Sequence, residues 1–272
     1  MANVNVVTTQ SGKNGNSIVI NGSGSARGSS GVFIGCGANG DDKGVTIGFG
    51  AAGSSGANGA VVIGFAATAN HEGNSADSYA SVAIGACALV KRMGVSVGYN
   101  ASAGIRGVAI GSGSSVEAAA CSESGGVAIG NSAYAQAGSV VIGRPAPTSC
   151  SVGNLVSVGV DNMLGSTNTS NSVIVGSGNT LTERGIVVGH GSTLDTIDAI
   201  IIGSNINTSA NYTPGSIVIG PDPDVNTPNY AQMFFKPGVG GCSGSVGFRI
   251  DGSSAIVPAN KFIALINSAL SL

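Results

Sequence analysis

The chain has little charge and few aromatic residues. Of its 272 residues, 9% are charged and 4% are aromatic, and tryptophan is absent. So few ionisable and aromatic side chains argue against most classes of globular enzyme. Disorder accompanies low hydrophobicity or high net charge. Here the mean hydropathy is +0.34 and the net charge is −2, so an ordinary disordered tail is excluded as well.

Long basic and long apolar runs are missing too. The longest basic run is Lys91-Arg92, so we expect no nucleic acid partner. No run reaches the roughly 18 apolar residues of a membrane span, so we expect no membrane insertion. The first ten residues, MANVNVVTTQ, lack the basic start and apolar core of a secretory signal. We therefore expect assembly in the cytoplasm of the cell that makes the protein.

Histidine is scarce, and the cysteines form no pattern. His71 and His190 lie many repeats apart, so they cannot share a metal or catalytic site within one chain. We predict no catalytic residue, no cofactor and no metal ligand. The cysteines are odd in number and share no position in the repeat described below: Cys36, Cys87, Cys121, Cys150 and Cys242. We interpret them as free thiols, with a bond between unlike cysteines of neighbouring chains as the alternative.

Glycine is abundant, with 46 residues, and much of it belongs to a repeat. The clearest copy reads SVAIGACALV at positions 81–90, and its core is apolar-x-apolar-Gly. The glycines that close the copies are spaced by a base period of 13 to 14 residues, with insertions at one phase. They are Gly35, Gly48, Gly64, Gly85, Gly98, Gly111, Gly130, Gly143, Gly159, Gly176, Gly189, Gly203 and Gly220. A degenerate copy at 18–21 precedes them. A fixed internal period is the signature of a repeat protein.

Each copy predicts two short strands. Apolar-x-apolar is strand alternation, and valine and isoleucine favour strands. The glycine fits a sharp corner, after which small residues recur two apart, as in Ala101 and Ala103. Stacked turns of this kind pair each strand with the turns above and below it. We therefore predict an all-β, parallel β-roll or solenoid of about 14 short turns. It should be wider in the second half, where leucine fills the inner position at Leu164, Leu181 and Leu194.

The middle residue of each first strand indicates whether other chains cover the outside of the roll. We expect it to point away from an interior that its two apolar neighbours fill. These middle residues carry no charge, and strands that are apolar on both faces are buried on both faces. A coil this thin cannot cover a second face, so we predict an obligate oligomer. The residues predicted to form its interface are Val62, Ala83, Ala109, Ala128, Val141, Ile174, Val187 and Ile201.

The repeat resembles the YadA-like head repeat of trimeric autotransporter adhesins, whose consensus is S-V-A-I-G-x-x-A-x-A. The closest copies are 81–88, GVSVGYNASA at 94–103 and GVAIGNSAYA at 126–135, and the resemblance covers residues 17–225. It implies a left-handed β-roll assembled as a homotrimer. A true member of that family also carries an export signal and a C-terminal membrane barrel, which we do not expect here.

The organisation follows from the repeat. We assign residues 1–16 to an N-terminal attachment or capping segment, 17–229 to the roll and 230–272 to a C-terminal tip or cap, with a strand at 246–250 and a short helix at 260–270. The longest insertion spans 70–79. We expect the insertion and the tip to contact a receptor. The candidate contact residues are His71, Glu72, Asp77, Tyr79, Tyr212 and Tyr230, the tyrosines being candidates for stacking on carbohydrate.

These features favour a non-catalytic, trimeric fibre or spike of a virus particle, such as a phage tail or head fibre, that attaches to a host surface. Its expected partners are its own copies, other virion proteins and a host surface glycan or protein. One alternative is a capsid decoration protein, and another is the head of a bacterial surface adhesin. A hexapeptide-type acyltransferase also repeats apolar-Gly motifs. It would need three-sided coils of about 18 residues, whereas this chain returns repeatedly to 13.

Overall fold

The protein is almost wholly β-structure in the part of the chain that the computed structural model describes. The described residues are 6–7, 18–20, 31–40, 43–53, 59–70, 80–116, 125–136, 138–144, 153–164, 169–208, 214–220, 231–236, 245–250, 257–258 and 261. No helix among them is long and apolar enough to cross a membrane. The chain divides into two compact units, Met1–Gly143 and Arg144–Leu272.

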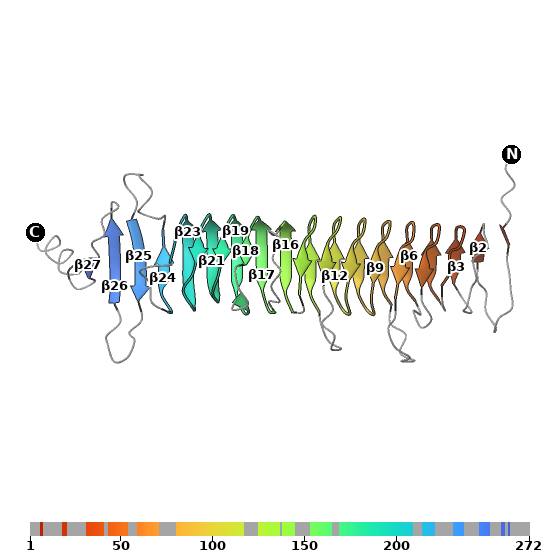
Figure 1. The fold of residues 1–272 in the computed structure, drawn as a ribbon. Coiled ribbons are helices and arrows are strands. Elements are labelled where there is room, and N and C mark those ends of the chain that lie inside the picture. The colour runs from red at the N-terminus through yellow and green to blue at the C-terminus, as the bar shows by residue number, and fades with distance from the viewer. Residues whose placement is uncertain are drawn as a thin grey trace, which may run out of the picture. The chain divides into compact units, whose positions relative to one another are not determined.

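Unit 1 is built on a parallel sheet of first strands, which we call its first sheet. Successive strands pair in register, one per turn, as Val82, Val95 and Val108 illustrate. Figure 1 shows them side by side. Every repeat core therefore forms a strand. The strands are β2 (Ile18–Ile20), β3 (Val32–Ile34), β4 (Val45–Ile47), β6 (Val61–Ile63), β8 (Val82–Ile84), β10 (Val95–Val97), β12 (Val108–Ile110), β14 (Val127–Ile129) and β16 (Val140–Arg144).

The second strand of each turn adds a parallel second sheet. Its strands are two residues long, in line with the brief run of small residues after each glycine. They are β5 (Ala52–Gly53), β7 (Thr68–Ala69), β9 (Leu89–Val90), β11 (Ser102–Ala103), β13 (Ser115–Val116) and β15 (Tyr134–Ala135). Each pairs with the second strand of the neighbouring turns. The predicted all-β parallel solenoid, with two strands per turn, is confirmed.

Unit 2 repeats the same plan with longer first strands. Its first sheet contains β17 (Val156–Val160), β19 (Val173–Ser177), β21 (Gly185–His190), β23 (Ala199–Ser204) and β24 (Ile217–Ile219), all parallel. Its second sheet contains β18 (Met163–Leu164), β20 (Thr180–Leu181) and β22 (Thr193–Leu194).

Antiparallel strands adjoin the parallel ladder in each unit. In unit 1, β1 (Val6–Val7) pairs antiparallel with β2. In unit 2, β25 (Ala231–Lys236) pairs antiparallel with β24, and β26 (Ser245–Ile250) and β27 (Val257–Pro258) follow. The strand predicted at 246–250 is therefore present. The helix predicted at 260–270 lies outside the described residues, except for the helical Lys261. Such pairing occupies hydrogen-bonding edges that would otherwise recruit other chains.

The corner after each first strand requires glycine. Gly98 has φ +136°, and a Cβ there would overlap the carbonyl oxygen of Gly111 on the next turn. The same overlap recurs along the ladder because each corner rests directly on its neighbour. We call the segment formed by this glycine and its two following residues the glycine corner. The segment that leads from the second strand to the next first strand is the return corner.

The interior corrects the prediction about which side chains face outward. Ala83, Ala109, Ala128, Ile174 and Ile201 are fully buried within the single chain. The other residues predicted to form the oligomer interface, Val62, Val141 and Val187, are buried in the same way. The prediction that middle residues face a partner is wrong. The coil is too thin to hold two large side chains per strand, so the single middle residue points inward and the pair of valine and isoleucine residues on either side of it points outward.

The two units fill their interiors differently. At the second position of the second strand unit 1 has smaller residues, such as Ala69, Ala103 and Ala135, whereas unit 2 has the fully buried Leu181 and Leu194. The predicted inner position is thus confirmed for these two leucines, and Leu164 is half-buried. Larger inner side chains need more volume at native packing density.

Unit 2 also contains a buried asparagine ladder. Asn179 is fully buried, and its Nδ2 donates to Oδ1 of Asn162 (3.2 Å) and to the carbonyl of Gly189 (2.8 Å). Its Oδ1 accepts from the backbone N–H of Ser192 (3.0 Å). Asn162 in turn donates to the carbonyl of Gly176 (2.9 Å). The amides thus satisfy backbone groups of neighbouring glycine corners, as buried polar groups require.

Replacing Asn179 by alanine is expected to lower the free energy of unfolding by about 2–4 kcal/mol, because it leaves several buried polar groups without partners. Urea unfolding followed by circular dichroism measures the change. The adjacent Thr180, half-buried on the outer side of β20, gives the matched control. Thr180→Ala should cost less than about 1 kcal/mol. Equal losses for both variants would contradict a structural role for the ladder.

Candidate functional site

The outward side of the first sheet is an apolar face. It carries two β-branched or aliphatic side chains per turn, at the first and third strand positions, as in Val108 and Ile110. Ile84, Ile110 and Ile142 are 36% to 38% exposed. No charged residue occupies these positions in any described strand of the parallel ladder; Arg144 lies two residues further along, at the end of β16. The strands therefore carry apolar side chains on both sides, as predicted. The residues predicted to face outward face the interior, and those predicted to face the interior face outward.

The apolar face of unit 1 is comparable in size to the largest apolar patches of monomeric proteins. From β3 to β16 it spans about 34 Å along the ladder and about 10 Å across it, or roughly 350 Å² in projection. The largest apolar patches on monomeric proteins are of this size and are often functional. A partner that covers it would gain roughly 25 cal/mol per Å² of apolar surface removed from water.

The outward side of the second sheet differs in character. It presents one side chain per strand, and several of these are hydroxyl-bearing, including Thr68, Ser102 and Ser115. A shallow groove of about 350 Å³ lies over β11, β13 and β15. It is lined by Lys91, Ser102, Ala103, Gly104, Ser115, Val116 and Tyr134. Hydroxyls, a phenol and an ammonium group could together hydrogen-bond a polar ligand.

The glycine corners of unit 1 carry a row of exposed aromatic rings. Phe49, Phe65 and Tyr99, each directly after a corner glycine, are 61%, 58% and 64% exposed. The rings of Phe49 and Phe65 are stacked, with centroids 5.7 Å apart and planes 7° from parallel. Ala86 occupies the same position on the turn between Phe65 and Tyr99. This row was not among the predicted sites, although the pattern Gly-aromatic at 48–49, 64–65 and 98–99 indicates it in the sequence.

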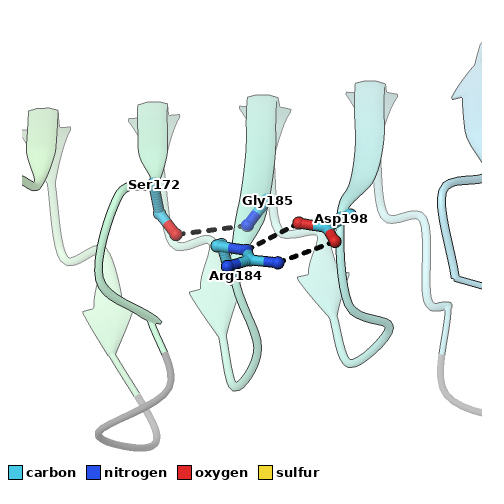
Figure 2. Close-up of polar contacts among 4 residues, drawn as sticks. All are labelled: Ser172, Arg184, Gly185 and Asp198. Atoms are coloured by element: carbon cyan, nitrogen blue, oxygen red, sulfur yellow. Dashed lines mark hydrogen bonds and ion pairs between the residues drawn. The ribbon is translucent and has the colours of Figure 1, made fainter.

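The return corners of unit 2 carry an ion pair. Arg184 and Asp198 lie on adjacent turns, and Nε and Nη2 of the arginine donate to the two carboxylate oxygens (2.6 and 2.8 Å). Figure 2 shows this pair beside the Oγ of Ser172, which accepts from the backbone N–H of Gly185 (3.1 Å). Hydrogen bonding to Arg184 lowers the pKa of Asp198. The stabilisation is therefore present above the unfolded-state pKa and is lost as the pH falls through the folded-state pKa. Because the pair is exposed, it contributes little to the stability of the contact between these two turns.

The predicted contact residues lie outside the described residues. They are His71, Glu72, Asp77, Tyr79, Tyr212 and Tyr230. His190 is exposed at the end of β21, where its Nδ1 is 2.9 Å from the Oγ of Ser177. Cys36 and Cys87 are exposed free thiols, and the other three cysteines lie outside the described ranges.

Within those ranges, no group of three or more histidine, cysteine, aspartate and glutamate side chains is arranged to hold a metal ion. The surfaces that stand out are therefore the apolar face, the second-sheet groove and the aromatic row. Comparison with family models, with curated proteins and with solved structures finds no match to this chain.

Proposed function

We propose that the protein is a non-catalytic structural component of a virus particle, a homotrimeric fibre or spike that attaches the particle to a host surface. In this assembly the apolar faces of three copies meet about a common axis. The second sheets and the corners then face solvent or a receptor.

The apolar face is the observation that supports this proposal most. Each turn adds two aliphatic side chains to one side of the first sheet, while the second sheet places hydroxyls outward on several turns. Such asymmetry fits a coil with one side against its own copies and the other in water. Self-association is favoured over a foreign partner because the face has the same period as the chain, so identical copies match turn for turn.

The composition supports a structural role. The chain is poor in charged and aromatic residues and rich in short, regular turns, which suits a stiff rod more than a pocket for chemistry. The resemblance of its repeats to trimeric adhesin heads favours three copies and a role in attachment.

Two measurements test the proposal. Light scattering on the purified chain should give three times its 26.2 kDa mass. Virus particles whose genome encodes this chain would be labelled with immunogold antibodies against it. The label should mark fibres or spikes on those particles. Labelling spread evenly over the shell would instead indicate a capsid decoration protein. A soluble monomer, or label on cell surfaces alone, would contradict the proposal.

A further inference from the structure

We propose that the gap in the aromatic row, between Phe65 and Tyr99 and above Ala86, binds a neutral pyranose ring of a surface glycan. We call this gap the aromatic slot. The inference rests on the proposed attachment role and deepens it, because it names a ligand class and a site among the described residues.

The slot follows from the register of the turns. Backbone N–H groups of Cys87 and Asn100 donate to the carbonyls of Phe65 and Ala86 (2.8 and 2.9 Å). The corners of Phe65, Ala86 and Tyr99 are therefore stacked one directly above the next. Aromatic residues at this position on adjacent turns can stack, as the nearly parallel rings of Phe49 and Phe65 show. Ala86 interrupts that stack and leaves one ring position unfilled.

The spacing of the turns leaves room for one ring in the slot. Two turns separate Phe65 from Tyr99, or about 9.6 Å at the usual strand spacing. Carbon atoms in contact lie about 3.5–4.0 Å apart, so one ring that contacts both side chains occupies about 7–8 Å. A pyranose chair is slightly thicker than a flat ring, and it has C–H groups on both faces that can contact the two aromatic side chains.

The charge distribution favours a neutral ligand. None of the seven glycine corners from Gly35 to Ser132 contains a charged residue. The charged residues of unit 1 in the described ranges are Lys43, Lys91, Arg92 and Arg106, and all lie at the return corners. On the three corners that form the slot, the exposed polar side chains are the phenol of Tyr99, the amide of Asn100 and the thiol of Cys87. The phenol and the amide can donate to and accept from sugar hydroxyls.

The test fills the slot without disturbing the fold. Ala86→Phe should complete the stack, because phenylalanine already occupies the equivalent positions 49 and 65. The matched control is Ser112→Phe, which adds a ring on the far side of Tyr99 and leaves the slot open. The full-length assembly would be applied to an array of neutral and acidic oligosaccharides. The best neutral oligosaccharide would then be titrated by calorimetry.

We expect binding to at least one neutral oligosaccharide, a loss of at least about tenfold in affinity for Ala86→Phe, and wild-type affinity for Ser112→Phe. If Ala86→Phe still binds the oligosaccharide, the proposal is overturned. It is also overturned if binding is lost only in Tyr134→Ala, because the ligand would then lie in the second-sheet groove. A fall in oligomer mass for Ala86→Phe would assign the slot to contacts between copies and also overturns it. If the wild type binds no array glycan but still binds host cells, the slot fails and the attachment role stands.

Discussion

Replacing Ile110 by lysine should abolish the proposed trimer while leaving the coil folded. Ile110 lies on the apolar face and is 38% exposed in the single chain, so lysine can reach water in the monomer. In the trimer the same position would bring three ammonium groups together in an apolar interface. An unpaired charge buried there costs several kcal/mol per copy. Light scattering should therefore give a mass of 26.2 kDa in place of three times that value.

Two control variants separate assembly from folding. Ser102→Lys, on the outward side of the second sheet, should leave the trimer intact. Ala109→Lys should prevent folding altogether, because Ala109 is fully buried inside the coil. Circular dichroism distinguishes the unfolded chain from the folded monomer. A trimer that persists in Ile110→Lys would show that the apolar face is not the contact surface.

The period of the sequence was enough to predict the architecture. Alternation around each closing glycine placed the first strands correctly, and small residues two apart, such as Ala101 and Ala103, placed the second. Both signals are local, since they depend on strand periodicity and on the geometry of one corner. The parallel stacking then followed because each turn is too small to bury its own apolar side chains.

The period of the sequence did not predict which side of the strand faces inward. Alternation says that Val108 and Ile110 oppose Ala109, and it does not say which set is inside. Interior volume decides this, since the opposite wall of the coil already carries inner side chains such as Ala101 and Val116. The size of the middle residue was the available signal: alanine or serine at several copies fits a narrow core better than paired valine and isoleucine.

The candidate sites were harder to foresee. The predicted contact residues lie in insertions and in the C-terminal tip, because loops commonly carry function. The aromatic row instead lies on the regular corners, where Phe65 and Tyr99 become neighbours of Ala86 only after the turns are stacked. The asparagine ladder was not predicted for the same reason, since it forms only after the turns are stacked. Asn162 and Asn179 stand where unit 1 has alanine, and their partners are backbone groups of adjacent turns that no single repeat contains.

The corner glycines should be the most sensitive positions to substitution, and Gly48 illustrates why. Gly48 has φ +140°, and a Cβ there would overlap the carbonyl oxygen of Gly64 on the next turn. Neither the backbone conformation nor the stacking distance can relax alone, because the corners above and below have the same geometry. We expect Gly48→Ala to lower the free energy of unfolding by about 4 kcal/mol or more.

The matched control lies two residues away. Gly50 also has positive φ, at +65°, but a Cβ there meets nothing within 4 Å. The equivalent positions already carry side chains at similar φ, as in Ala66 (51°) and Cys87 (56°). Gly50→Ala should therefore change stability by only about 1 kcal/mol, the balance of left-handed strain against a less flexible unfolded chain. Urea unfolding of both variants compares them directly. If Gly48→Ala were as mild as Gly50→Ala, the carbonyl contact between stacked corners could not be what fixes the spacing of the turns.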